Sequence, residues 1–147
     1  MEKHTCRTYF AIYFKFNEEK NLALLKERKE CLPQDIDIFN KDQVERYIID
    51  NFDVKPEWRR HHFVVGLNEE YDVDVNAMLR VTLKKLMGKE SVIKGLCKLF
   101  DVSTSLVIVP RIASGSDMPN QMLSLDFDII SFLYESGTSM DLDYYVI

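Results

Sequence analysis

Residues 7–16, RTYFAIYFKF, constrain the possible fold of this chain more than any other segment, because two sets of side chains alternate along them. One set is apolar apart from its first member and comprises Thr8, Phe10, Ile12, Phe14 and Phe16. Side chains of a β-strand point alternately to the two faces of a sheet, so the segment predicts a strand with one face against a core. Such a strand needs partner strands and a second layer that covers the apolar face.

Two further strands are predicted in the middle of the chain. Residues 61–67 would place His61, Phe63, Val65 and Leu67 on one face, and the polar NEEYD that follows is expected to end the alternation. Residues 103–112, STSLVIVPRI, are rich in β-branched side chains. Because proline has no N–H to donate, Pro110 indicates that this strand leaves the sheet, or runs at its edge, near that residue.

A fourth strand is predicted at the end of the sequence. Met140, Leu142, Tyr144 and Val146 alternate with Asp141, Asp143, Tyr145 and Ile147. If this strand is central in the sheet, the first set faces the core and the two aspartates face water.

Helical patterns occupy the segments between these strands. Residues 18–30 predict a charged surface helix, and residues 41–52 predict a helix with Val44, Tyr47 and Ile48 on one stripe. Residues 75–101 predict one long helix or two consecutive helices joined near Gly88 and Lys89. A last helix is expected to begin with Ser124 as its N-cap and to end at Gly137, with Asp126 and Asp128 in its first turns.

The order of these elements predicts an α+β fold. It consists of a four-stranded antiparallel or mixed sheet with helices packed on it, a layered sandwich. The helix between the last two strands permits a parallel connection. Residues 1–147 are expected to form a single globular domain, which is a natural size for one core.

Composition narrows the class of protein. No run approaches the 18 apolar residues of a membrane span and no signal peptide is evident, so a cytoplasmic protein is expected. Cys6, Cys31 and Cys97 are widely spaced and lack histidines at ligand spacing, which predicts reduced thiols and no metal site or cofactor.

The C-terminal half resembles a known bacterial family. The segments LRVTLKKLMGKESVIKGLCKLFDV, LVIVPRI, LSLDFDIISFLYESGT and DLDYYV together resemble the proteins grouped as domain of unknown function 4279, over roughly residues 58–147. The resemblance implies a bacterial, intracellular protein and supplies no catalytic residues.

The segment WRRHHFVVGL, residues 58–67, concentrates the chemistry of the chain. Trp58, Arg59, Arg60 and His62 form a candidate ligand site, since two guanidinium groups can clamp a carboxylate or a phosphate. The alternative interpretation is a solvated entrance to a core strand, with Trp58 lying over the core. His61 and His62 would point to opposite faces of a strand, which argues against a shared metal ion. The net charge of −5 and the narrow basic cluster argue against nucleic-acid binding.

Charge is distributed unevenly along the sequence. Residues 101–147 contain one basic side chain, Arg111, and seven acidic ones. Asp117, Asp141 and Asp143 are expected to be the most exposed of these acids and to face a basic protein partner.

The absence of any catalytic motif predicts a binding protein rather than an enzyme. The leading hypothesis is a protein-interaction module, such as an immunity or antitoxin-like protein. The alternative is a regulator that binds a small anionic ligand, or an enzyme that uses the Arg/His cluster at residues 59–62.

Overall fold

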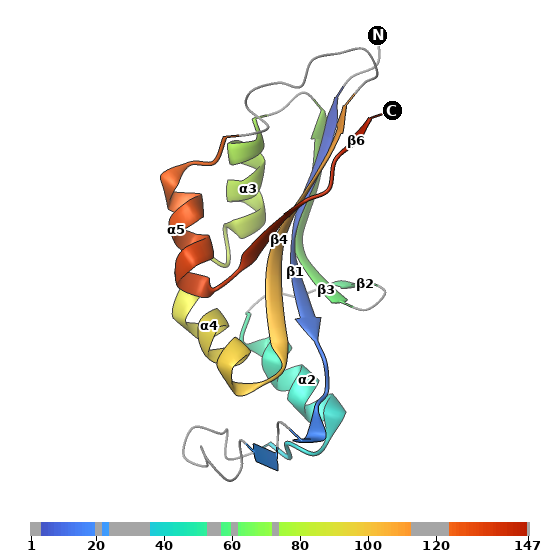
Figure 1. Cartoon of the computed structure of the whole chain (residues 1–147), viewed down its shortest axis with the longest axis vertical. Helices are drawn as coiled ribbons and strands as arrows, with labels where there is room; N and C mark the ends of the chain where they lie inside the picture. Colours follow the sequence, from blue (N-terminus) through green and yellow to red (C-terminus); the bar gives the residue numbers. More distant parts are fainter. Residues whose placement is uncertain are drawn as a thin grey trace.

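One mixed β-sheet has helices packed on one of its two faces (Figure 1). The computed structural model describes residues 4–19, 22–23, 36–52, 57–59, 62–71, 74–112 and 124–146. Its strands are β1 (Thr5–Phe14), β2 (Glu57–Arg59), β3 (His62–Tyr71), β4 (Val102–Ile112), β5 (Ser139–Leu142) and β6 (Tyr145–Val146). Its helices with defined bounds are α2 (Lys41–Asp50), α3 (Val75–Leu83), α4 (Glu90–Leu99) and α5 (Phe127–Ser136).

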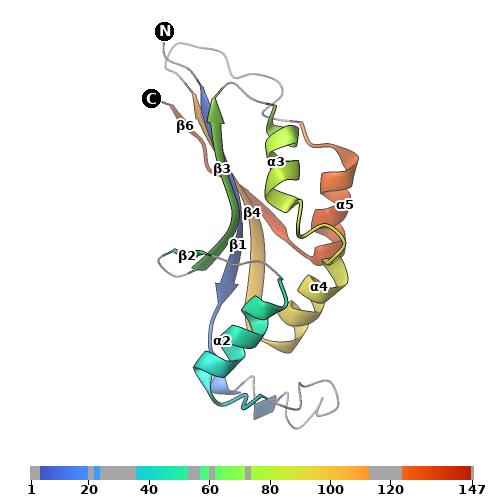
Figure 2. The ribbon, with the colours of Figure 1, turned by 180° about the vertical axis from the view of Figure 1, so that it is seen from behind.

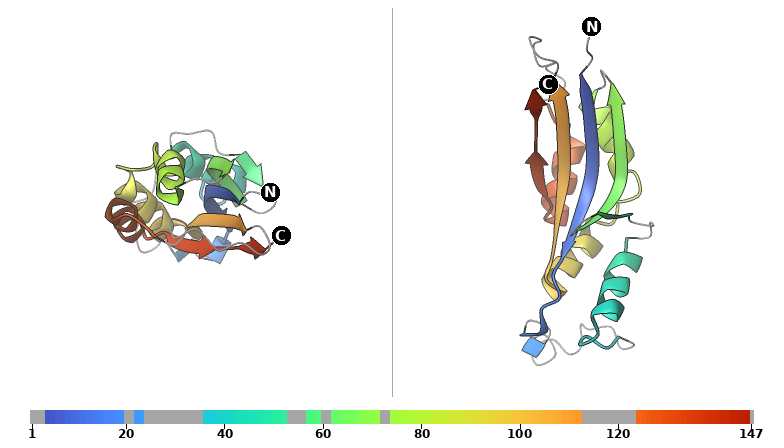
Figure 3. Two further views of the ribbon diagram at one scale, coloured as in Figure 1. Left: turned by 90° about the horizontal axis from the view of Figure 1, so that it is seen from above. Right: turned by 90° about the vertical axis from the view of Figure 1, so that its right-hand side faces the viewer.

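The strands follow the order β2-β3-β1-β4-β5 across the sheet (Figure 3). The first strand, β1, lies in the centre and pairs antiparallel with both β3 and β4. The outer edge consists of β5 and then β6, and both pair parallel with β4. The predicted α+β class, the mixed sheet, the layer of helices and the parallel connection through α5 are therefore confirmed. The sheet also contains the short strand β2, which was not predicted.

The alternation of β1 divides its side chains between the two faces as predicted. Thr8, Phe10 and Ile12 are fully buried and face the helices. The ring of Phe10 lies 6.1 Å from that of Phe52, which follows α2, and 6.3 Å from that of Phe132 in α5. One side chain of the central strand thus contacts both ends of the helical layer.

The predicted helices are confirmed where the structure describes them. Val44 and Ile48 of α2 are buried, and residues 75–101 form two consecutive helices, with Gly88 at a φ of 97° in the turn between them. Of the helix predicted at 18–30, residues 18–19 and 22–23 are described, and all four are helical. Arg60, His61, Asp117 and Cys31 lie outside the described residues.

The start of α5 differs from the prediction, because its N-cap is Asp126 and not Ser124. The side chain of Asp126 makes no capping hydrogen bond and pairs instead with Arg80 of α3. The buried amide of Asn76 instead holds the backbone at the start of the helix: its Oδ1 accepts from the Asp126 N–H at 2.8 Å, and its Nδ2 donates to the Ser124 carbonyl at 2.9 Å. The helix ends at Gly137 with a φ of 71°, as predicted.

A β-bulge in β3 overturns the predicted orientation of Leu67 and the predicted end of that strand. Thr8 pairs with Asn68 and Phe10 with Val65, so Gly66 and Leu67 together lie opposite a single residue of β1. The extra residue turns Leu67 away from the helices, whereas Phe63 and Val65 remain in the core as predicted. Beyond the bulge the strand continues through NEEY to Tyr71.

Close packing of α3 explains why glycine occupies position 66. Gly66 has a φ of 67°, and a Cβ there would lie 2.4 Å from the carbonyl oxygen of Thr82. The hydroxyl of Thr82 donates to the Gly66 carbonyl at 2.7 Å, which holds the helix against the bulge.

The prediction that the strand leaves the sheet near Pro110 is wrong, because β4 continues to Ile112 and pairs there with β1 and β6. The carbonyl of Ile108 accepts from the Asp143 N–H at 2.9 Å and so points towards the β5 edge. Backbone groups two residues apart point to the same side of a strand, so the position where Pro110 lacks an N–H faces that edge as well. There it lies opposite the break between Leu142 and Tyr145, where no ladder bond is lost.

The strand predicted at the end of the sequence is observed as two short strands, β5 and β6, at the edge of the sheet and not in its centre, so the condition for a buried face is not met. Met140 and Leu142 pair with the buried residues Leu106 and Ile108, yet 43% and 47% of their own surfaces remain exposed. An edge strand has a neighbouring strand on one side only, so these side chains stay partly exposed. No helix among the described residues is long and apolar enough to cross a membrane.

Replacing Gly66 with alanine is expected to lower the free energy of unfolding by about 2–4 kcal/mol, because backbone strain adds to a forced shift of α3. The matched control is Gly95→Ala in α4, where a Cβ meets nothing within 4 Å and alanine favours the helix by about 0.5–1 kcal/mol. Urea unfolding of the parent and both variants measures the difference. Two variants of equal stability would contradict the close packing of α3 on β3.

Candidate functional site

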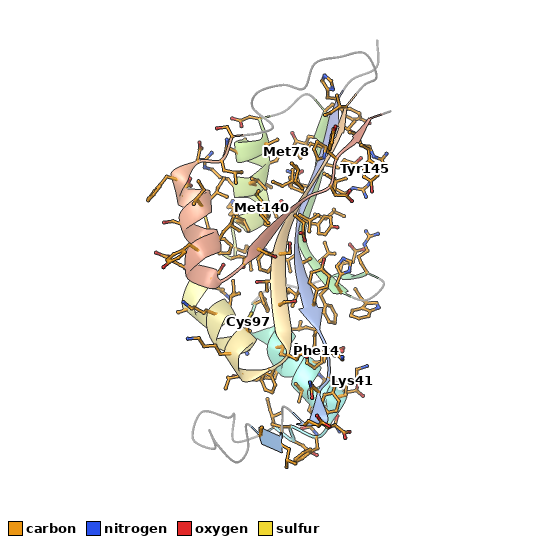
Figure 4. All side chains as sticks on the ribbon, viewed as in Figure 1. Phe14, Lys41, Met78, Cys97, Met140 and Tyr145 are labelled. Atoms are coloured by element: carbon orange, nitrogen blue, oxygen red, sulfur yellow. The ribbon has the colours of Figure 1, made fainter. Side chains whose placement is uncertain are left out.

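The face of the sheet opposite α2–α5, called the open face below, is not covered by any described helix (Figure 2). It is hollowed into a depression of about 710 Å³. Residues of β1, β2, β3, β4 and β6 and of the β5–β6 connection line it: Arg7, Tyr9, Arg59, His62, Val64, Leu67, Glu69, Val109, Arg111, Asp143 and Tyr145. Figure 4 labels Tyr145 on this side of the sheet and Met78 and Cys97 on the helical side. The depression is the candidate site because charged, aromatic and apolar groups from separate parts of the sequence meet there.

Strand pairing sets the positions of these side chains. Arg7 pairs with Glu69 on one side and Val109 on the other, and Arg111 pairs with Tyr145. Paired residues of neighbouring strands point to the same face, so these side chains lie in two successive rows across the sheet. The framework is therefore a set of hydrogen-bonded strands and not a loop.

One end of the depression is basic. The guanidinium of Arg7 donates to Glu69 Oε2 from Nε at 3.3 Å and from Nη2 at 3.1 Å. Arg111 lies diagonally across from Arg7 on β4, and such neighbours have Cα atoms about 7–8 Å apart. Among the described residues, no carboxylate forms an ion pair with Arg111. At this end the guanidinium of Arg7 is in an exposed ion pair, and that of Arg111 can bind an anion without breaking an ion pair with a described residue.

The other end contains Arg59 and His62, which pair across the β2–β3 hairpin. Arg59 Nη2 donates to Glu57 Oε2 at 3.1 Å. The ring of His62 lies 6.3 Å from that of Tyr9 and nearly parallel to it, at 17°, and 5.1 Å from that of Tyr13. Aromatic rings therefore connect this end to the centre of the depression.

Two aspartates of the open face are already hydrogen-bonded within the protein. Ser105 Oγ donates to Asp141 Oδ2 at 2.6 Å, and Tyr145 Oη donates to Asp143 Oδ2 at 3.0 Å. The bond to Asp143 raises the pKa of Tyr145, and the negative charge of the same carboxylate adds to the effect. Burial is the main cause that raises the pKa of Tyr9, followed by the charge of Asp143. Both phenols therefore remain neutral over a wider pH range than a free tyrosine.

The predicted ligand cluster is divided between the two faces of the sheet. Arg59 and His62 line the depression, whereas Trp58 pairs with Phe63 on the opposite face, with their rings 4.5 Å apart. That contact agrees with the interpretation of Trp58 as a cover over the core. Of the three acids predicted to bind a partner, Asp141 and Asp143 lie on the open face.

The sequence analysis did not assign most of the side chains that line the depression to a site, among them the basic and aromatic residues Arg7, Tyr9, Arg111 and Tyr145. The alternation of residues 7–16 predicts that Tyr9 faces away from the core, and Arg7 lies two residues before it on the same face. Their meeting with Arg111 and Tyr145 depends on the strand order, which no local pattern contains.

Among the described residues, no group of three or more histidine, cysteine, aspartate and glutamate side chains could hold a metal ion. Cys6 is buried in the core on the helical side of β1, and burial raises the pKa of its thiol to about 11.

No family model, no curated protein and no solved structure matches this chain. The resemblance of residues 58–147 to domain of unknown function 4279 therefore stays a prediction.

Truncation of Arg111 is expected to change the free energy of unfolding by less than about 0.5 kcal/mol, because its side chain is exposed and forms no ion pair with a described residue. Asn76→Ala is the comparison: it removes both hydrogen bonds that hold the start of α5 and should lower stability by about 1–3 kcal/mol. Chemical unfolding of both variants tests this difference. A large loss in Arg111→Ala would show that the basic end has a structural role.

Proposed function

We propose that this protein binds a small ligand through an anionic group and that the open-face depression is the binding site. The observation that carries the proposal is the convergence of Arg7, Arg59 and Arg111 on one depression. Guanidinium groups bind carboxylates and phosphates through two parallel hydrogen bonds, and such charge-assisted bonds are among the strongest in proteins. A regulator that binds a small anion was one of the two functions considered from the sequence.

The partners of these arginines leave them able to bind a ligand. Ion pairs between exposed side chains contribute about 0–1 kcal/mol, so an incoming anion can displace Glu69 from Arg7 or Glu57 from Arg59 at little cost. At Arg111 no carboxylate of a described residue would have to be displaced. The basic end at Arg7 and Arg111 is therefore the first contact that we assign to the anion.

The proposed function predicts that inorganic phosphate or sulfate raises the melting temperature of the parent protein, because a ligand that binds the folded state stabilises it. A concentration a hundred times the dissociation constant would add about 2.7 kcal/mol. Arg111→Ala should abolish most of the rise. Arg46→Ala, which removes an exposed arginine of α2 on the helical side, is the matched control and should respond as the parent does. The same response in all three proteins would contradict the site.

A second candidate function is the protein-interaction role, with an immunity-like module as its specific form. A stripe of apolar side chains favours it: Phe127, Ile130 and Tyr134 lie on the outer side of α5, and Phe127 and Tyr134 are 81% and 85% exposed. Their spacing of three and four residues places them on one helical face. Large exposed aromatic residues are typical of protein interfaces. Glu135 on the same helix favours a basic partner, and Asp141 and Asp143, on the open face across the sheet, add negative charge that would attract such a partner over a distance.

The interaction role predicts that a basic protein is captured from the native host at low salt. Asp141→Asn with Asp143→Asn should slow its association and flatten the salt dependence, because charge complementarity acts mainly on the association rate. Phe127→Ser with Tyr134→Ser should instead speed dissociation, since it removes apolar contact area. Surface plasmon resonance over a salt series separates the two effects. Capture that is unchanged in both double variants would contradict this role.

A further inference from the structure

We infer that the ligand of the open-face depression is a planar aromatic compound that carries one phosphate or carboxylate group. This inference rests on the proposed function, because it specifies the class of anion that the same site would bind. Its support is the set of aromatic and apolar side chains that lie between the two ends of the depression, one at Arg7 and Arg111 and the other at Arg59.

The centre of the depression is aromatic. Tyr9 follows Arg7 by two residues on β1, so the two side chains are neighbours on the open face, about 7 Å apart along the strand. The ring of His62 is nearly parallel to that of Tyr9, and the two rings belong to different strands. A flat ring can stack on such a surface, whereas an inorganic anion gains nothing from it.

Apolar side chains flank this aromatic surface. Val64 and Val109 line the depression from β3 and β4, and Leu67 lines it from the bulge. Leu67 reaches the open face because Gly66 adopts a left-handed conformation that other residues rarely adopt. Bulges commonly redirect a side chain beside a binding site. The bulge thus adds a third apolar side chain to the depression, which suits a ligand with an apolar body.

The acids of the depression limit the charge of the ligand. Glu69 and Asp143 line it together with the three arginines, so a compound with several negative charges would meet repulsion. The same carboxylates can accept hydrogen bonds from amino or hydroxyl groups of a ligand. One anionic group at Arg7 and Arg111, a ring on Tyr9 and donor groups towards the acids satisfy all of these contacts. Nucleoside monophosphates and aromatic carboxylic acids share this chemistry.

Isothermal titration calorimetry with four probes tests the inference: inorganic phosphate, adenosine, adenosine monophosphate and benzoate. We expect an aromatic anion to bind at least about tenfold more tightly than phosphate or adenosine. Tighter binding of the nucleotide than of benzoate would identify a nucleotide as the source of the ring, and the reverse order would identify an aromatic acid.

Variants separate the ring from the anion. Tyr9→Leu should weaken binding of the aromatic anion about fivefold or more and leave phosphate binding unchanged, because stacking on an aromatic side chain contributes at least that much. Tyr134→Leu, which alters an exposed tyrosine of α5, is the matched control and should bind as the parent does. Leu67→Ser offers a second test of the centre if Tyr9→Leu fails to fold, because Leu67 is itself partly exposed.

Each result has a defined meaning. Phosphate that binds as tightly as the aromatic anions, with no effect of Tyr9→Leu, would overturn the inference and leave the anion site standing. Adenosine that binds as tightly as its monophosphate would overturn both the inference and the proposed function, since the anion would then contribute nothing. Absence of binding by every probe would overturn the proposed function together with the inference.

Discussion

The contact between α3 and the bulge of β3 positions both layers of this molecule. The hydroxyl of Thr82 uses its single proton on the Gly66 carbonyl, so the 2.8 Å contact with Thr8 requires Thr8 to be the donor. These bonds join α3, β3 and β1, and they leave neither the Thr8 nor the Thr82 hydroxyl without a partner. Because a buried hydroxyl without a partner costs about 1–3 kcal/mol, helix and bulge stabilise each other.

The same contact shapes the opposite side of the sheet. Without the bulge, the alternation of β3 would direct Leu67 towards the helices with Phe63 and Val65. With it, Leu67 joins the open face beside Tyr9. The core and the candidate site are therefore coupled through a single glycine. A binding surface built from paired strands is also more rigid than one built from loops, which reduces the entropy lost when a ligand binds.

The sequence predicts the elements better than it predicts their neighbours. The alternation at residues 7–16 identified the core side chains of β1, and the helical period at 75–101 allowed the two helices that are observed. Both patterns are local, so a short window contains them. The orientation of Leu67, the place of Pro110 and the exposure of Met140 depend instead on a bulge, on strand order and on an edge. Those features follow from pairing between distant segments, which periodicity does not report.

The candidate site shows the same division. Arg59 and His62 are predicted as site residues because they lie together in the sequence, and the pairing of β2 with β3 brings both to the depression. Trp58 was grouped with them by sequence and is separated from them by the pleat of the strand. Arg7 and Arg111 lie more than a hundred residues apart and meet through the β1–β4 pairing. A site built across strands therefore appears in the sequence as isolated residues.

Charge illustrates why composition alone gives an incomplete account of function. The acidic C-terminal third suggested a surface for a basic partner, yet its acids are distributed among separate tasks. Asp126 and Asp128 pair with Arg80 of α3, while Asp141 and Asp143 accept hydrogen bonds from Ser105 and Tyr145. On the open face these last two stand beside arginines from other strands. Acidic and basic side chains at fixed positions attract some charged groups of a ligand and repel others. Such a surface is therefore suited to selecting one ligand by the placement of its charges.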